Sequence, residues 1–251
     1  MEYRTEYDAT AGEKPTRAPR SQQKRGWKIF LRDILLIFLA ALLISFLIKT
    51  FLIRSFYIPS DSMNNTLVRN DRIIVNQLEP GLLPVSRGDV VVFRDPGGWL
   101  PPQAPLEQNP IVAALDWTMA VVGLSAPDSN DHLIKRIIGL PGDHVVCCNT
   151  LGQMSVNDIP LSEPYALLPP GQSSVSKDAF DVTVPENSLW VMGDNRYDSL
   201  DSRYHPNAPG KGFVPMDNVV GRALVISWPL DRWSWLGDYP EVFRGVEEAD
   251  E

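Results

Sequence analysis

The sequence contains only two cysteines and three histidines among its 251 residues. The cysteines, Cys147 and Cys148, are adjacent, and the histidines, His132, His144 and His205, are scattered along the chain. Neither set has the spacing of metal ligands, so the sequence predicts no metal and no cofactor. Adjacent cysteines pair only through a strained ring, so free thiols, a vicinal disulfide and an intermolecular bond all stay open.

Positive charge is scarce over most of the chain, whose formal net charge is −8. Residues 1–33 hold eight basic and five acidic side chains, whereas residues 54–251 hold fourteen basic and twenty-six acidic ones. An acidic body of this kind argues against a nucleic-acid partner.

Long apolar runs are absent except at 34–53, which Lys49 alone interrupts, near its end, where a long side chain reaches the interface. About 20 apolar residues are needed to cross a bilayer. A cleavable signal peptide is the alternative, but this apolar core is too long for one and no small-x-small cleavage site follows it. We therefore expect one retained membrane anchor.

The basic residues predict the orientation of this anchor. Arg20, Lys24, Arg25, Lys28 and Arg32 all lie on its N-terminal side. By the positive-inside rule, the residues before 34 stay in the cytoplasm and those from 54 onward lie outside. The predicted location is the plasma membrane, crossed once, with the lipid bilayer as a partner.

Composition divides the chain into four expected segments. Residues 1–26 lack apolar periodicity, as expected for a disordered cytoplasmic tail, and residues 27–54 form the transmembrane anchor. Residues 55–238 form an extracytoplasmic domain with an insertion at about 97–131, and residues 239–251 form an acidic C-terminal tail.

Short apolar, β-branched runs, bounded by Gly, Pro, Asn and Asp, fill the large domain. They indicate a mostly antiparallel β domain. The runs lie at 72–78, 88–95, 132–143, 144–158, 180–184, 188–195 and 221–228.

Two segments depart from this texture. The insertion contains IVAALDWTMAVVGL (111–124), which is long enough for a short helix but too short to span a membrane, so it either packs on the domain or touches lipid. WPLDRWSWLGDY (228–239) holds three tryptophans within eight residues, which suits a membrane interface and a core edge equally.

Serines cluster where the chain leaves the apolar run, in PSDSMNNTL (59–67). A serine hydroxyl is a poor nucleophile unless a base removes its proton. Both His132 and Lys135 are available in HLIKRIIGLPGD (132–143). A lysine serves as a base only where burial favours its neutral form, which lowers its pKa by up to ~5 units. The residues alone do not decide between the two.

Five features follow one another along the chain: the N-terminal anchor, PSDSM, RGDVVVF, KRIIGLPGD and GDNRYDSLDSR. In this order they resemble the type I signal peptidases, membrane-bound Ser/Lys proteases that remove signal peptides from exported proteins. The resemblance extends from Ile34 to about Trp228. It implies a mainly β fold, in which one transmembrane helix precedes an antiparallel coiled-sheet catalytic domain with a smaller β cap region.

The resemblance also implies the catalytic roles. Ser62 matches the nucleophile and Lys135 the general base. Ser60 matches a hydroxyl that forms an oxyanion hole together with the backbone N–H of Ser62, where fixed donors meet the developing negative charge.

The last of these motifs, GDNRYDSLDSR, contains residues that match the family's supporting residues around the serine and the lysine. Ser199 matches a serine that hydrogen-bonds the lysine and orients it, and Gly193 a small residue that leaves room for the lysine side chain. Asp194, Asp201 and Arg203 match polar residues that hold the site in place. An ordinary ion pair on a turn explains Asp201 and Arg203 equally well.

Substrate binding is implied in the same way. Apolar subsites for small side chains such as Ala, at two substrate positions, would be lined by Phe56, Ile58, Pro59 and Ile134, and an extended substrate would add as a strand. The implied partners are the signal peptides of secreted preproteins, bound by a monomer near the export machinery.

The sequence also departs from the family pattern. The family often has Pro where Asn65 stands here, and an Asp-Asn pair in place of Tyr197 and Asp198. These positions supply neither the nucleophile nor the base, so we expect changes in loop shape or substrate fit.

Two other classes of protein fit part of the pattern. A membrane-anchored β module that binds peptides without cleaving them explains the anchor and the strands, but not Ser62, Lys135 and Ser199 together. A self-cleaving repressor shares the Ser/Lys pair but needs a helical DNA-binding domain, which residues 1–33 do not contain.

Overall fold

The computed structural model describes residues 21–101 and 131–250, and the chain divides between Ser45 and Phe46 into two compact units. Residues 1–20, where the tail is expected, lie outside the described residues, as do residues 102–130, which make up most of the expected insertion.

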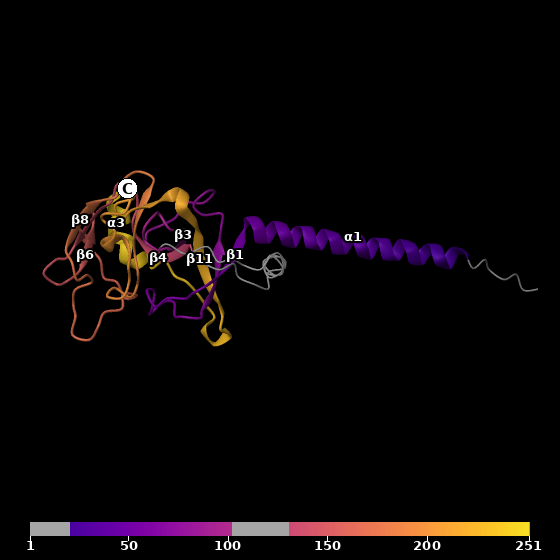
Figure 1. Cartoon of the computed structure of the whole chain (residues 1–251), viewed down its shortest axis with the longest axis horizontal. Coiled ribbons are helices and arrows are strands. Elements are labelled where there is room, and N and C mark those ends of the chain that lie inside the picture. Colours follow the sequence, from indigo (N-terminus) through magenta and orange to yellow (C-terminus); the bar gives the residue numbers. More distant parts are fainter. Residues whose placement is uncertain (1–20, 102–130, 251) are drawn as a thin grey trace, which may run out of the picture. The chain divides into compact units, whose positions relative to one another are not determined.

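The described part of the N-terminal unit, residues 21–45, belongs to helix α1 (Ser21–Phe51), which is one uninterrupted helix (Figure 1). Its span Gly26–Ile48 has a mean hydropathy of 2.5, and its large apolar side chains are exposed. At 1.5 Å per residue these 23 residues extend over about 35 Å, enough to cross a membrane. The expected boundaries shift, because α1 begins inside the expected tail, and Ile53 and Arg54 belong to the first strand.

The predicted mainly β, antiparallel domain is confirmed: every pairing between named strands in the described part of the chain is antiparallel. The large sheet has eight strands, and Figure 1 labels β3, β4 and β11 at its centre. Its order is β1 (Ile53–Tyr57), β2 (Arg72–Asn76), β11 (Val219–Trp228), β3 (Val90–Arg94), β4 (His132–Gly139), β9 (Ser188–Met192) and β10 (Val214–Pro215), and β12 (Ser234–Trp235) pairs with β11.

A second sheet of four strands forms the smaller β region that the resemblance implies. Its order is β7 (Ile159–Pro160), β6 (Met154–Val156), β5 (His144–Cys147) and β8 (Phe180–Thr183). Three short 3-10 helices connect strands of the domain: η1 (Ser202–Tyr204), η2 (Met216–Asn218) and η3 (Leu230–Arg232).

The large sheet is covered on both faces, and strand β3 shows why its sequence is almost wholly apolar. Val90 and Val92 belong to one buried cluster, and Val91 and Phe93 to another. Successive side chains of a strand point to opposite faces, so an unbroken apolar run places apolar side chains on both faces of the sheet. Strand β4 pairs with β3, and in their register Lys135 lies opposite Val91, among buried residues of the sheet.

The C-terminal residues form helix α3 (Pro240–Asp250), not the acidic tail expected at 239–251. Val242, Phe243 and Val246 are buried in the core cluster that also contains strands of the small sheet. Their spacing of one and four residues puts them on one face of a helix. The acidic residues Glu247 and Glu248 lie on its exposed side.

The tryptophan rings of the segment 228–239 are exposed, although Leu236 belongs to a core cluster and Tyr239 packs against another. Trp228, Trp233 and Trp235 expose 53%, 54% and 68% of their surface, and only Leu236 of this segment is buried. Contact with a membrane interface remains the prediction for these rings.

Candidate active site

Ser62 opens a tight turn that directly follows the extended segment after β1. Within the turn, the backbone N–H of Asn64 donates to the carbonyl of Asp61 (3.0 Å), and the N–H of Leu67 to that of Met63 (2.8 Å). Met63 and Leu67, which lie four residues apart, are both fully buried. Their packing in the core fixes the position of the turn. Ser62 itself keeps 8% of its surface exposed.

Lys135 reaches Ser62 from the centre of β4, 73 residues later in the sequence. Its Nζ lies 2.7 Å from Ser62 Oγ and 2.9 Å from the carbonyl oxygen of Ile134. Burial lowers the pKa of Lys135 to about 8, although the carboxylates of Asp201 and Asp194 act in the opposite direction. A large fraction of the lysine is therefore neutral near pH 8, and a neutral amine can accept the serine proton.

Ser60 lies beside the predicted nucleophile: its Oγ is 3.3 Å from Ser62 Oγ. The structure thus brings together Ser60, Ser62 and Lys135, the three residues to which the sequence assigns chemistry.

The strand β9 ends against the backbone of Ser62. A Cβ atom on Gly193 would lie 2.4 Å from the carbonyl oxygen of Ser62 and 2.3 Å from Ser199 Oγ, so no side chain fits at position 193. Gly193 therefore leaves room for the Ser62 backbone and for the Ser199 side chain, and its expected role of leaving room for the lysine side chain stays a prediction.

Asn195 binds the segment that contains Ser62 through two backbone carbonyls. Its backbone N–H donates to Ser62 O (3.1 Å), and its side-chain Nδ2 donates to Asp61 O (3.1 Å). The sequence analysis did not assign a role to Asn195, although this residue lies within the GDNRYDSLDSR box. Its position in that box was the available signal.

Asp201 and Arg203 form a buried bidentate pair, with Nε–Oδ1 and Nη2–Oδ2 distances of 2.8 Å. Both side chains are almost wholly inaccessible, and Asp201 Oδ2 also accepts the Gly193 N–H (2.9 Å). Burial alone would raise the pKa of Asp201, but the Arg203 guanidinium and the Gly193 N–H hold it below its usual value. The pair is therefore tied to the loop that contacts Ser62, unlike an ordinary ion pair on an exposed turn.

Asp194 binds a second buried guanidinium. Arg136, the residue after Lys135, donates Nε to Oδ1 (2.9 Å) and Nη2 to Oδ2 (2.7 Å). Thr66, from the turn that begins at Ser62, also donates its hydroxyl to this carboxylate. Asp194 thereby connects three segments of the site: β4, the serine turn and the loop after β9.

A third buried ion pair, between Arg196 and Glu163, supports the loop after β9 and was not predicted from the sequence. Arg196 donates to both carboxylate oxygens of Glu163 at 2.7 Å and to Gly193 O at 3.1 Å, and both charged side chains are inaccessible to solvent. Arg196 lies in the last sequence box, whereas no pattern distinguishes Glu163.

Ser199 is buried, with 5% of its surface exposed, and its Oγ makes no hydrogen bond within the described part of the chain. The structure does not contain the expected hydrogen bond to Lys135. Ser199 and Lys135 nevertheless line the same cavity, which leaves this hydroxyl available beside the amine.

His132, the other candidate base, is directed elsewhere. Its ring forms an ion pair with Asp131 and lies 5.3 Å from the ring of Phe56. Burial lowers the pKa of His132. Among the described contacts of this ring, none involves Ser62, which favours Lys135 as the base.

A cavity of about 220 Å³ is lined by Ser60 and Lys135, among other residues. Two segments form most of its wall: residues 56–60 and residues 132–135. All four predicted substrate-binding residues, Phe56, Ile58, Pro59 and Ile134, line this one cavity.

The loop shape at Asn65 differs from one that a proline permits. Asn65 has φ +90°, and its Nδ2 donates to Tyr165 O at 2.9 Å. A proline ring fixes φ near −65°, so this backbone conformation excludes the residue that the family often has here. Asparagine tolerates positive φ better than most residues do.

Groups of three or more His, Cys, Asp or Glu side chains that could hold a metal ion do not occur among the residues that the structure describes. The two cysteines form a vicinal disulfide at the end of β5, one of the alternatives that the sequence left open.

Comparison with known proteins places this site in a family. A signal peptidase I from Leptolyngbya laminosa is 34% identical over 94% of this chain and 98% of its own, and a probable signal peptidase I from Mycobacterium leprae is 38% identical over 72% of this chain and 70% of its own. A crystal structure of a signal peptidase I from Enterococcus faecalis aligns with 55% of this chain and 95% of its own, at 24% identity and a TM-score of 0.35. The family model described as "Signal peptidase, peptidase S26" matches residues 31–228, so the chain belongs to the signal peptidase S26 family.

Proposed function

We propose that this protein is a membrane-anchored serine endopeptidase that removes signal peptides from exported preproteins, with Ser62 as nucleophile and Lys135 as general base. Family membership supports signal peptide removal. The observation that carries the Ser/Lys mechanism is the distance of 2.7 Å between Lys135 Nζ and Ser62 Oγ, on a lysine whose burial lowers its pKa to about 8.

In the first half of the proposed reaction, neutral Lys135 accepts the proton of Ser62 Oγ while that oxygen bonds to the carbonyl carbon of the scissile peptide. The carbonyl oxygen becomes an oxyanion, to which the Ser62 N–H and the Ser60 hydroxyl donate. Lys135, now an ammonium, gives its proton to the leaving nitrogen as the C–N bond breaks. The products of this half are a free amine and an ester on Ser62.

In the second half, Lys135 takes a proton from water while the water oxygen attacks the ester carbonyl. The proton then returns from Lys135 to Ser62 Oγ as the ester bond breaks. The released signal peptide carries the new carboxylate, and the serine and the amine are restored. We assign to the buried Ser199 hydroxyl the role of orienting Lys135 in these steps, because it faces the same cavity without a partner of its own.

The cavity between residues 56–60 and 132–135 supports the substrate class. Both walls are extended segments, so a peptide placed between them would run as an added strand. The cavity measures only about 220 Å³, and its lining includes the apolar side chains of Phe56, Ile58 and Ile134, which favours small residues such as Ala before the scissile bond.

The anchor would keep this chemistry at the membrane. Ser62 is eleven residues beyond Phe51, the last residue of α1, so an extended chain places the serine at most about 40 Å from the end of the helix. We propose that residues before α1 are cytoplasmic and that the β domain is outside, acting as a monomer near the export machinery.

The experiment that tests the reaction is incubation of the purified full-length protein in detergent with a preprotein that carries an Ala-x-Ala site. We expect one cleavage after the second Ala, and no product with Ser62→Ala although the variant still unfolds cooperatively. Binding of the preprotein without cleavage by the unaltered protein would favour the alternative, a membrane-anchored non-catalytic peptide-binding β module.

The orientation has its own test, in which protease is added outside intact cells. We expect the β domain to be degraded and the residues before α1 to be spared. A protected β domain would overturn the proposed topology.

A further inference from the structure

A second cavity of about 550 Å³ adjoins the first and has a different lining. The two share Lys135 and a few neighbours, but Ser62 lines only the second. A peptide whose scissile carbonyl meets Ser62 must continue on both sides of it. Since the first cavity takes the residues before the scissile bond in the proposed function, the second is the space left for the residues after it.

We infer that the second cavity binds the first residues of the mature chain, and that Lys177 gives it a preference for an acidic side chain there. This inference rests on the proposed function and adds to it a binding site on the leaving side of the scissile bond.

Apart from the predicted base Lys135, the charges that line this cavity leave one cation, Lys177, without a carboxylate among the described residues. Arg69 pairs with Asp61, and the carboxylates of Asp61 and then Asp198 raise the pKa of Arg69. The Asp61 carboxylate is therefore engaged by Arg69, and the charge of Asp198 also acts on this guanidinium. Lys177 forms no ion pair among the described residues, so its charge remains available to a ligand.

The Lys177 ammonium is held in place from one side. Its Nζ donates to Tyr197 O (3.0 Å) and lies 5.2 Å from the centre of the Tyr197 ring. A primary ammonium has three N–H donors, and only one of them is used here. The others can meet a carboxylate in the cavity without breaking this contact.

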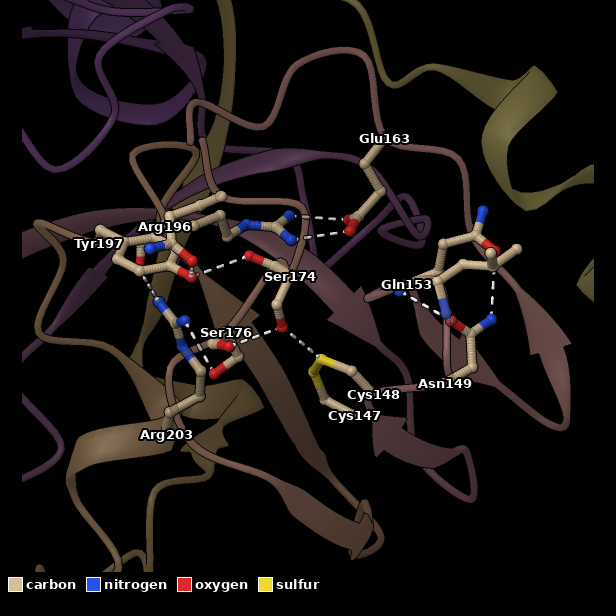
Figure 2. The surroundings of a disulfide bond; sticks show 12 residues. Cys147, Cys148, Asn149, Gln153, Glu163, Ser174, Ser176, Arg196, Tyr197 and Arg203 are labelled. Atoms are coloured by element: carbon tan, nitrogen blue, oxygen red, sulfur yellow. Dashed lines mark hydrogen bonds and ion pairs between the residues drawn. A yellow bond between two sulfur atoms is a disulfide. The ribbon is translucent and has the colours of Figure 1, made fainter. Parts of the chain in front are cut away.

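Tyr197 is in turn fixed to the segment that precedes Lys177. Its hydroxyl donates to Ser174 O (3.1 Å). Ser174 Oγ donates to Ser176 O (2.8 Å) and lies 3.3 Å from Cys148 Sγ, so that Ser174 lies between Tyr197 and the disulfide in Figure 2. The wall that carries Lys177 is thereby bound to the turn after β5, and a positioned cation loses less entropy when it binds a ligand.

The test uses the full-length protein in detergent and three preproteins that differ at one residue, the second position after the scissile bond, which is Glu, Gln or Lys. An exposed ion pair contributes about 0.2–1 kcal/mol, so we expect kcat/KM for Glu to exceed that for Lys by about 1.4- to fivefold. Lys177→Glu should reverse the order, and Lys177→Gln should remove it.

Two controls accompany these variants. Lys211→Glu makes the same charge change at another exposed lysine, which lies outside the cavity lining, and should keep the original order. Substitutions at the small residues of the preprotein before the scissile bond should lower cleavage by all variants alike, and cooperative thermal unfolding of each variant in detergent shows that it is folded.

The outcomes separate this inference from the function on which it rests. Cleavage of all three preproteins at equal rates, or an unchanged order in Lys177→Glu, would overturn the role of Lys177 while leaving the peptidase intact. No cleavage of any preprotein by the unaltered protein would overturn the proposed function, and this inference with it.

Discussion

Gly193 lies against Ser62 with no room for a methyl group between them: a Cβ at position 193 would be 2.4 Å from the Ser62 carbonyl oxygen. That oxygen belongs to the backbone of the predicted nucleophile and cannot move without moving Oγ. The need for glycine here is one of space, since Gly193 is not among the glycines with positive φ.

We therefore expect Gly193→Ala to displace Ser62 and to lower kcat by about 10²-fold or more, because an error of about 1 Å in the position of a reacting group costs a factor of this size. Steady-state cleavage of a preprotein measures it. Gly81→Ala is the matched control, since a Cβ at position 81 would lie 4.0 Å from the nearest atom. Normal turnover in Gly193→Ala would mean that the loop after β9 does not fix the serine.

The pH dependence of cleavage distinguishes the two candidate bases. If Lys135 is the base, kcat/KM rises with pH as the amine loses its proton and levels off above about pH 8, the lowered pKa of this lysine. If His132 were the base, the rise would occur below about pH 6.5, because burial lowers the pKa of that imidazole.

Substitution at the two positions provides the second half of this test. Lys135→Arg should lose at least about 10²-fold in kcat, as should Lys135→Ala, since a guanidinium stays protonated and cannot accept the serine proton. His132→Ala should change kcat less than about twofold. A Lys135→Arg enzyme with near-normal turnover would be incompatible with the Ser/Lys mechanism.

The same burial that makes Lys135 a base destabilises the folded protein. Its pKa falls from 10.5 in the unfolded chain to about 8 in the folded one, a difference worth about 3 kcal/mol. Below about pH 8 the lysine is protonated in both states, so the full penalty applies. Between pH 8 and 10.5 the unfolded chain binds the extra proton, and stability recovers as the pH rises.

We therefore expect Lys135→Met to unfold at a higher temperature than the unaltered protein at pH 7, by up to about 3 kcal/mol in free energy, with a gain that shrinks between pH 8 and 10.5. Thermal unfolding of both proteins in detergent at several pH values measures this. Equal stability of the two at pH 7 would show that Lys135 is not desolvated in the folded state.

The sequence predicted the parts of this protein that repeat a simple pattern. The strands from β2 to β11, except the two-residue strands β7 and β10, were visible as short apolar runs. Ser62 and Lys135 were identifiable because whole sequence motifs surround them. Contacts that depend on one backbone atom were not predictable, such as those of Asn195 with Asp61 O and Ser62 O. Glu163 lies in no box and reaches Arg196 only through the fold.

Helix α3 differs from the tail predicted at 239–251 for another reason. Its sequence contains a helical spacing of apolar residues, but its many acidic residues are more typical of an exposed tail. The apolar residues of PEVFRGVEEAD lie one and four positions apart, which is a helical spacing, whereas the acidic end of the segment suggested a tail. The structure shows that three apolar residues suffice when the core offers a place for them.

This helix leads to a test of stability. Phe243 is fully buried in the cluster shared with the small sheet, so Phe243→Ala should cost about 3–5 kcal/mol in the free energy of unfolding. The exposed neighbour gives the control: Arg244→Ala should change it by less than about 0.5 kcal/mol. Urea unfolding of the full-length protein in detergent compares the two. A small loss in Phe243→Ala would restore the interpretation of this segment as a tail.

Asn195 is a positioning residue, and its two hydrogen bonds predict different outcomes for two substitutions. Asn195→Ala removes the bond from Nδ2 to Asp61 O but keeps the backbone N–H that donates to Ser62 O. A bond of this kind contributes about 0.5–1.5 kcal/mol, so we expect kcat to fall by about two- to tenfold with KM nearly unchanged. Asn195→Asp replaces the donor by a carboxylate oxygen that faces the carbonyl of Asp61, and repulsion between two acceptors should lower kcat further than the alanine does.

Asn218 provides the matched control, because its Nδ2 also donates to two backbone carbonyls, those of Arg94 and Asp95, but in a part of the domain that does not contact Ser62. Asn218→Ala should leave kcat unchanged, whatever its effect on the free energy of unfolding. A purely structural role for Asn195 would instead lower the unfolding temperature and leave kcat of the folded fraction intact. Equal kcat in Asn195→Asp and the unaltered protein would show that this side chain does not hold the serine segment in its reactive position.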